Sequence, residues 1–391
     1  MKHLVFVLAL LWAQAAYAVT AIEAWVDTDC GTNGNGVTSE CAKGAGEDGA
    51  YITLSDALTG ESAARSDLVA RDESLTIMLE GTTADTTAPI NFTNALFNTD
   101  STHTVRLKGA ETPTGRHPGY WSTNHYRLSG ASGGGNCGGD GVLTIGENYV
   151  YVDDFQIEQT GTQEMTCNGG IALSLVNGIY VNVYANGMFL RNNPAGTPQT
   201  TTHGIYMTYL QGGRTVYIAN NIMTGFTGSA STGMYIGCGG AGDNITVYNN
   251  TSYGNGIGLR FWKGTLCGSG GSVFHMKNNL LQNNTVNDYN NPSTGGSSPI
   301  YDFAANITSN SSSPDGAQYR NQTAQFVNAP ALDFHLAKID TAATDKCISL
   351  ATDATYQFVR DMEYTQRASR WDCGADEQPD RFRMNFFGVE W

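Results

Sequence analysis

Three basic side chains, Arg260, Lys263 and His203, are the first candidates for acid–base chemistry in this 391-residue chain. His and Lys side chains are common proton donors and acceptors in catalysis, and Arg can hold an anionic group. His275 has the same capacity. Because a surface Arg or Lys is most often only solvated, these residue types alone do not establish catalysis.

Aromatic residues recur in the same part of the chain, on segments in which apolar and polar residues alternate. Tyrosine and tryptophan rings can pack on the apolar C–H faces of sugars while their polar tips bond to hydroxyls. The alternative is that stacked tyrosines only stabilise a sheet. The candidate binding residues are Tyr206, Tyr235, Trp262, Tyr217, Tyr248, His275 and Lys277.

Carboxylates in metal-binding or catalytic spacing are sparse. Asp27 and Asp29, followed by Gly31, resemble a short calcium loop, so Ca²⁺ is the one cofactor that we consider. The match is partial because Cys30 interrupts it and no bidentate Glu follows, and a plain Asp/Gly turn explains it as well. Asp153 and Asp302 are too far apart in the repeat to act as a pair in hydrolysis.

A repeat between about residues 150 and 310 sets the architecture. Apolar alternation followed by an Asn-rich turn recurs in segments that end at Asn186, Asn221, Asn250, Asn279 and Asn306, at spacings of 35, 29, 29 and 27 residues. Periods of 20–50 residues indicate a solenoid, and alternation of period two indicates strands. A second strand follows in most copies. We therefore predict an all-β fold, a right-handed single-stranded parallel β-helix whose turn asparagines stack as a ladder.

The repeat resembles the pectate-lyase-like family of exported right-handed β-helices. The opening, with Trp25-Val-Asp27 and Thr53-Leu-Ser-Asp-Ala-Leu58, is similar to the strand and short helix that cap such solenoids, and Asp333-Phe-His-Leu336 and Asp372-Cys-Gly-Ala-Asp-Glu377 are similar to their usual ending. The resemblance implies a polysaccharide substrate. In lyases of this kind an Arg or calcium neutralises a uronate carboxylate and a basic side chain removes the neighbouring proton, roles that Arg260, Lys263 and His203 would take.

The ends of the chain suggest export. Residues 1–18 have a basic start, an apolar run and Ala16-Tyr17-Ala18, as in a secretory signal peptide. We expect a cap and first coils over 19–139, a core over 140–315 and a closing segment over 316–391, in a protein that is secreted, periplasmic or at the cell surface.

Eight cysteines fit disulfides, and proximity pairs Cys30 with Cys41, Cys137 with Cys167, Cys238 with Cys267, and Cys347 with Cys373, although 105 connectivities exist.

The charge limits the partners. The 36 acidic and 21 basic residues give a net charge of −15, which argues against nucleic acid because phosphate binding needs clustered cations. No segment is long and apolar enough to predict a membrane span.

Two functions remain open: a non-catalytic protein that binds an extracellular glycan, such as an adhesin or a virion tail or spike component, which we slightly favour, and a polysaccharide lyase or glycoside hydrolase. The oligomeric state is not predicted.

Overall fold

The computed structural model describes residues 19–92, 96–131, 140–161, 168–173, 182–193, 201–207, 213, 215–238, 242–263, 272–291, 300–357, 359–367 and 370–378. The predicted signal peptide lies outside these ranges. Within them, no helix has the length and apolar character needed to cross a membrane.

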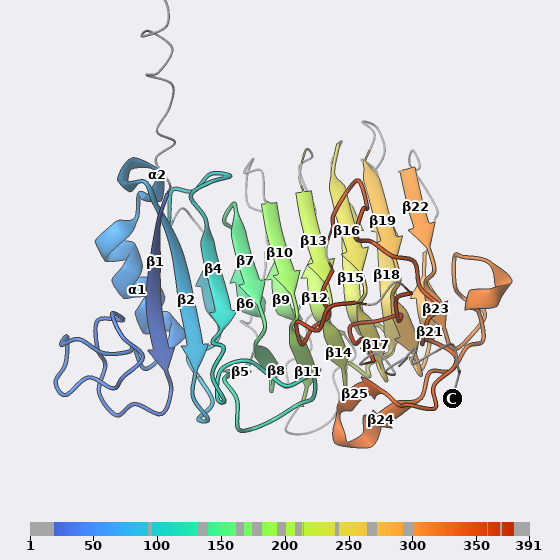
Figure 1. Ribbon diagram of the computed structural model, residues 1–391, viewed down its shortest axis with the longest axis horizontal. Helices are drawn as coiled ribbons and strands as arrows, with labels where there is room; N and C mark the ends of the chain where they lie inside the picture. Colours follow the sequence, from blue (N-terminus) through green and yellow to red (C-terminus); the bar gives the residue numbers. More distant parts are fainter. Residues whose placement is uncertain are drawn as a thin grey trace, which may run out of the picture.

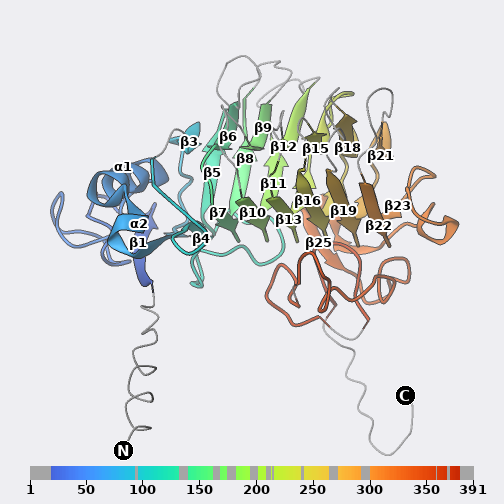
Figure 2. The same cartoon turned by 90° about the horizontal axis from the view of Figure 1, so that it is seen from above.

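Three parallel sheets run along the molecule and form a β-solenoid of about six turns (Figures 1 and 2). Sheet 1 contains β1 (Thr20–Asp27), β2 (Glu73–Glu80), β4 (Val105–Gly109), β7 (Val150–Asp153), β10 (Asn182–Asn186), β13 (Thr215–Ala219), β16 (Asn244–Tyr248), β19 (Val273–Lys277) and β22 (Ile300–Ala304). Sheet 2 contains β5 (Arg127–Gly130), β8 (Gln156–Gln159), β11 (Phe189–Asn192), β14 (Ile222–Thr224), β17 (Thr251–Tyr253), β20 (Leu280–Gln282) and β23 (Ile307–Thr308). Sheet 3 contains β3 (Ile90–Phe92), β6 (Asp140–Ile145), β9 (Asn168–Leu173), β12 (Thr202–Met207), β15 (Thr232–Cys238), β18 (Ile257–Lys263) and β21 (Asn287–Asn290). The predicted all-β parallel solenoid is confirmed.

The interior is filled by alternate residues of every strand. In sheet 1, Val216 lies beside Ile245 and Ile218 beside Val247 on neighbouring coils, and all four are at most 1% exposed. Burial of one such side chain stabilises the fold by ~1.5–3 kcal/mol. The repeating register therefore produces one apolar core along the whole solenoid.

A stack of buried asparagines holds the turn between sheets 1 and 2. Asn221 Nδ2 donates to Asn250 Oδ1 at 2.9 Å, Asn250 to Asn279 at 2.9 Å, and Asn279 to Asn306 at 2.8 Å. Each Nδ2 also donates to a main-chain carbonyl, and each Oδ1 accepts a main-chain N–H from the coil before. The stack ends on Asp315, which accepts from Asn306 Nδ2 at 2.8 Å. The predicted ladder is confirmed for these four asparagines.

The placement of Asn186 in this ladder was wrong. Asn186 pairs with Ala219, two residues before the ladder position, and Met188 is the residue that meets Asn221. The repeat here is thus 33 residues from Asn186 to Ala219. A slip of two residues leaves each side chain on its correct face, so alternation could not reveal it.

Each ladder asparagine is preceded by a residue in the left-handed conformation. Asn220, Asn249 and Asn278 have φ values of 54°, 51° and 62°. Asn tolerates this region because its short side chain bonds locally. The first Asn of each pair therefore makes the turn, and the second makes the ladder.

A second ladder, which the sequence analysis did not identify, lies between sheets 2 and 3. Asn255 Oδ1 accepts the Phe226 N–H at 3.0 Å, and Asn284 Oδ1 accepts the Asn255 N–H at 3.0 Å. Asn284 Nδ2 then donates to Asp288 Oδ1 at 2.8 Å. Both ladders therefore end on a carboxylate, which accepts the last amide N–H.

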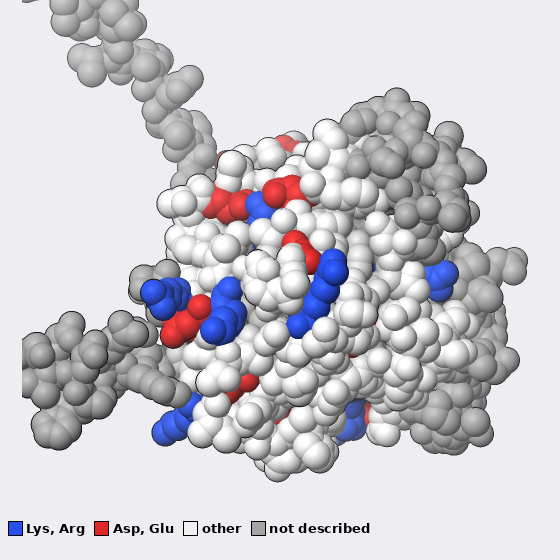
Figure 3. All heavy atoms as spheres, turned by 90° about the vertical axis from the view of Figure 1, so that its right-hand side faces the viewer, with Lys and Arg blue, Asp and Glu red and all other residues white. Residues whose placement is uncertain are grey.

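The two ends of the solenoid are closed differently. The first coil is covered by α1 (Leu54–Arg65), whose N-terminal cap is Thr53, with α2 (Leu68–Arg71) beside it (Figure 1). At the last coil, Phe303 of β22 packs with Phe261, Tyr289 and Tyr301. Figure 3 looks on to this end and shows its charged side chains in small separate groups among the other described atoms. The predicted capping helix is confirmed.

A closing segment, residues 316–378, folds back over the solenoid and contains η1 (Ala317–Tyr319), η2 (Ala329–Ala331) and the antiparallel pair β24 (Phe326–Asn328) and β25 (Asp333–Leu336). Figure 1 shows its red part crossing in front of the sheet 1 strands. The left-handed asparagines hold it: Asn220 Nδ2 donates to the Arg360 carbonyl at 3.1 Å, and Asn278 Nδ2 donates to the Ile348 carbonyl at 2.7 Å. The turn asparagines thus serve both the solenoid and its closing segment.

Arg367 is the centre of this closure. Its side chain is fully buried and donates to Glu377 Oε2 at 3.0 Å, to Asn220 Oδ1 at 3.1 Å and to the Gly374 carbonyl at 3.0 Å. A buried guanidinium is tolerated only when such partners replace its water. Arg367 therefore joins the end of the chain to the turn of the solenoid.

Two of the predicted disulfides are confirmed. Cys30 is bonded to Cys41 and Cys347 to Cys373, each with a Cα–Cα distance of 5.2 Å. Cys137, Cys167 and Cys267, and the side chain of Cys238, lie outside the described part of the chain, so the other two pairs stay predictions.

We predict that Asn250→Leu lowers the free energy of unfolding by ~1–3 kcal/mol, because the main-chain N–H of Asn221 loses its acceptor and Asn221 Nδ2 loses one of its two. Chemical denaturation of both proteins checks this. Thr285→Leu, at an exposed site on the same solenoid, is the control and should change little. Equal stability of Asn250→Leu and the wild type would contradict the role given to the ladder.

We also predict that Arg367→Leu costs ~3–5 kcal/mol and loosens the closing segment, because the buried carboxylate of Glu377 loses its cationic partner and keeps the Asp372 N–H. Hydrogen exchange of residues 340–378 should accelerate in this variant. The exposed Arg370→Leu is the matched control. Unchanged exchange in Arg367→Leu would show that other contacts hold the segment.

Candidate functional site

Sheet 3 brings three of the predicted site residues into one row. Tyr206 of β12 pairs with Tyr235 of β15, and Tyr235 pairs with Arg260 of β18. The two tyrosine rings lie 5.2 Å apart, and the Arg260 guanidinium lies over the Tyr235 ring at 5.7 Å. Tyr206 is 7% exposed, whereas Tyr235 and Arg260 are partly exposed. We call Tyr206, Tyr235 and Arg260 the sheet 3 row.

Close backbone packing beside this row depends on glycine. A Cβ at Gly204 would lie 2.5 Å from the Gly233 carbonyl, and a Cβ at Gly233 would lie 2.8 Å from the Gly258 carbonyl. Real Cβ atoms do not approach a carbonyl so closely, so each coil needs glycine there. The glycines therefore fix the strands that carry the row.

His203 lies beneath the tyrosines and is only 1% exposed. Its ring stacks on Tyr206 with a centroid distance of 5.0 Å and lies 5.1 Å from Tyr235. Its Nδ1 is 2.8 Å from Thr232 Oγ1. Burial, and to a lesser degree the charge of Arg260, lowers the pKa of His203 to about 3. The imidazole is therefore neutral over the physiological range.

The remaining candidates of β18 are Trp262 and Lys263. Trp262 pairs with Gly237 and is partly exposed. Lys263 pairs with Cys238, but its side chain lies outside the described part of the structure. Its assignment as a catalytic base stays a prediction.

The predicted residues of sheet 1 lie under the closing segment. The Tyr217 ring packs against the Tyr356 ring at a tilt of 36°, with centroids 4.5 Å apart. Tyr248 is fully buried and donates to Asp353 Oδ1 at 3.2 Å, and burial raises its pKa. Sheet 1 therefore presents these tyrosines to the chain's own C-terminal part.

His275 and Lys277 belong to the same covered row. Lys277 Nζ lies 2.7 Å from Asp302 and 2.9 Å from Asp353, and it is only 8% exposed. His275 Nδ1 lies 2.8 Å from Asp302 Oδ2. These contacts give both residues partners inside the protein, and their assignment to glycan binding stays a prediction.

Asp27 and Asp29, the candidate calcium ligands, lie at the end of β1. Asp29 accepts hydrogen bonds from the main chain and hydroxyls of Thr82 and Thr83 at 2.7–3.0 Å. Although burial raises the pKa of Asp29, these bonds bring it below its usual value. Asp27 accepts the Asp29 N–H at 2.9 Å. Through these bonds Asp29 connects the end of β1 to Thr82 and Thr83. Ca²⁺ binding stays a prediction.

Asp153 and Asp154 are a buried carboxylate pair at the end of β7. Arg106 Nε lies 3.3 Å from Asp153, and the Tyr364 hydroxyl donates to Asp154 at 2.6 Å. Burial raises the pKa of both carboxyls. With 6% and 0% exposure they support the closing segment and have no access to a polysaccharide.

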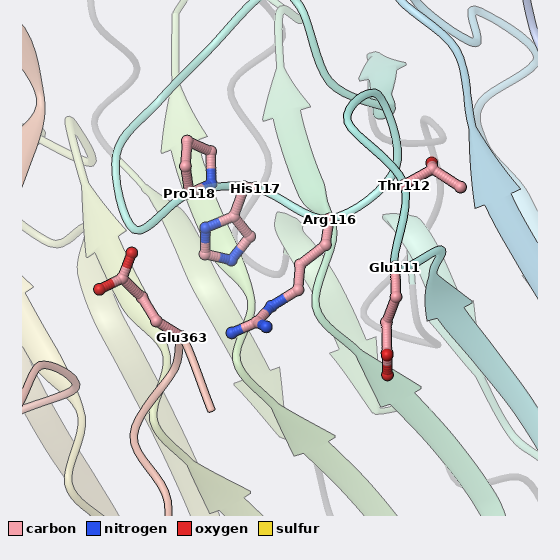
Figure 4. Close-up of a pocket in the computed structure, with 6 residues that line it drawn as sticks. All are labelled: Glu111, Thr112, Arg116, His117, Pro118 and Glu363. Carbon is pink, nitrogen blue, oxygen red and sulfur yellow. The ribbon is translucent and has the colours of Figure 1, made fainter. Parts of the chain in front are cut away.

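A hollow of about 300 Å³ lies where the loop after β4 meets the closing segment. Figure 4 shows its lining, with the Arg116 guanidinium between Glu111 and Glu363; the six lining residues are Glu111, Thr112, Arg116, His117, Pro118 and Glu363. Both ring nitrogens of His117 have hydrogen-bond partners. Nε2 lies 2.5 Å from the Gly187 carbonyl, and Nδ1 accepts the Gly119 N–H at 3.2 Å. This hollow could not be predicted from the sequence, because its two walls are about 250 residues apart along the chain.

Comparisons of the chain with models of known protein families and with curated protein sequences find no match. The established class is therefore that of the fold, a parallel β-solenoid.

We predict that His203 remains neutral between pH 8 and pH 5. Its depressed pKa means that its contribution to stability is fully present above the ordinary His pKa of about 6.5 and is lost as the pH falls from there towards 3. The ¹H–¹³C signal of the His203 ring, assigned with His203→Asn, should not shift over this range. A titration midpoint near 6.5 would contradict the buried placement.

Proposed function

We propose that the protein is an exported β-helix protein that binds an extracellular polysaccharide on the exposed face of sheet 3. The observation that carries the proposal is the sheet 3 row. It offers two tyrosines, of which Tyr235 is the more exposed, and a cation on consecutive coils, one coil spacing of ~4.8 Å apart, so several points along one sugar chain can be held in sequence. Tyrosine faces suit sugar C–H surfaces, and Arg suits hydroxyl or anionic groups.

The contrast with sheet 1 supports this choice of face. Tyr217 and Tyr248 of sheet 1 pack against Tyr356 and Asp353 of the closing segment, and Tyr217, like Tyr235, Arg260 and Trp262 of sheet 3, is partly exposed. A glycan on sheet 3 therefore needs no displacement of Tyr356 or Asp353. Two disulfides in the described residues are compatible with an extracellular location.

A non-catalytic role, as in an adhesin or a virion tail or spike component, agrees best with the burial of His203, which leaves no exposed base in the described row. The resemblance to the pectate-lyase-like family supports carbohydrate as the ligand class, and fold analogy does not establish catalysis. A glycan array with the full exported chain identifies the ligand.

The second candidate is a polysaccharide lyase or glycoside hydrolase. One observation favours it: the positive charge of Arg260 contributes to the lowered pKa of His203, so a cation and a neutral imidazole lie in one cluster. Incubation with polysaccharides, followed by ultraviolet absorbance for unsaturated products and a reducing-sugar assay, decides between the two. Turnover that is lost in His203→Asn with binding retained would favour the enzyme.

We predict that Tyr235→Ala weakens glycan binding by ~1–2 kcal/mol, because a ring that packs on the sugar is lost. Tyr217→Ala on the covered sheet 1 is the matched control and should leave the affinity unchanged. Arg260→Ala should matter most for charged glycans. Calorimetry with a glycan chosen from the array measures these affinities, and wild-type binding by a Tyr235/Arg260 double variant would exclude this face.

A further inference from the structure

We propose that the closing segment holds a divalent metal ion such as Zn²⁺ between His335, Glu363 and Asp376. A ring nitrogen of His335 and one carboxylate oxygen from each acid lie within 4.8 Å of one another. His335 Nε2 and Glu363 Oε1 are 3.3 Å apart. This matches the ~3.3 Å between two ligands of a tetrahedral ion with bonds of ~2.0–2.1 Å.

The histidine is oriented as a metal ligand requires. His335 Nδ1 lies 2.5 Å from Asp333 Oδ1, which leaves Nε2 directed at Glu363. A carboxylate on the second ring nitrogen fixes the tautomer of most metal-binding histidines and strengthens the ligand. Asp376 is also fixed, because its Oδ2 accepts the Leu336 N–H at 2.7 Å. Binding the ion would displace the proton from Nε2.

Gly119 packs closely against the His335 ring. A Cβ at Gly119 would lie 2.4 Å from Nε2, so any side chain there would clash with the imidazole. Gly119 has φ 78°, a conformation that other residues adopt only with strain. Glu363, one of the three proposed ligands, also lines the 300 Å³ hollow, so the proposed site lies beside a space that can hold water.

The donor set indicates which ion fits. One imidazole and two carboxylates suit Zn²⁺ or Mn²⁺, whereas Ca²⁺ takes six to eight oxygen ligands. Three protein ligands with a fourth open position are typical of zinc sites that bind a water or a substrate group. The ion would join β25 to two later parts of the closing segment and so stabilise it.

Isothermal titration of the untagged, EDTA-treated full chain with Zn²⁺ tests the proposal. We expect one equivalent to bind, with an upward shift of several degrees in the melting temperature and little effect of Ca²⁺ at the same concentration. Glu363→Gln should weaken the affinity at least tenfold, and Asp333→Asn by about 10–100-fold. Glu111→Gln, which alters the same hollow outside the ligand set, should stay within twofold.

The Glu363 variant is decisive because the Glu363 side chain is 34% exposed and its loss leaves the core intact. Its circular dichroism and melting temperature in EDTA should equal those of the wild type. Bound Co²⁺ should give visible d–d bands that disappear in Glu363→Gln. Wild-type Zn²⁺ affinity in a folded Glu363→Gln protein, or no saturable Zn²⁺ binding by the wild type, would overturn the proposal.

Discussion

The need to hydrogen-bond buried amides is the constraint on which this structure depends. A solenoid turn directs main-chain N–H and C=O groups inward at every coil, where water cannot reach them, and each unpaired group costs ~1–3 kcal/mol. The asparagine ladder solves this for four coils in succession and passes the last N–H to Asp315. Asp288 ends the second ladder in the same way.

The same turn also positions the closing segment on the solenoid. Because Asn220 and Asn278 bond to the closing segment, and Arg367 binds Asn220, the segment is held across sheet 1. On sheet 3, the side chains of Tyr235, Arg260 and Trp262 are partly exposed. The position of the closing segment is therefore consistent with the binding face that we propose.

Local patterns made the solenoid predictable, and distant contacts did not. The ladder could be found because Asn221, Asn250 and Asn279 recur at a constant spacing of 29 residues. Asn255 and Asn284 share that spacing, but a Gly precedes Asn255 whereas an Asn precedes Asn284, so the two do not form a repeated Asn-Asn pair. The row of Tyr206, Tyr235 and Arg260 followed from alternation. The contact of Tyr217 with Tyr356 could not be predicted in this way, because Tyr356 lies 139 residues later and no repeat connects the two.

The central claim is that a glycan lies on sheet 3, and side-chain footprinting tests it most directly. Hydroxyl radicals label exposed aromatic side chains, and a bound sugar chain shields those that it covers. With the glycan present, the account predicts protection of Tyr235 and Trp262 and no change at Tyr217 or Tyr356. Protection confined to Tyr217 and Tyr356, with Tyr235 labelled as in the free protein, would contradict it.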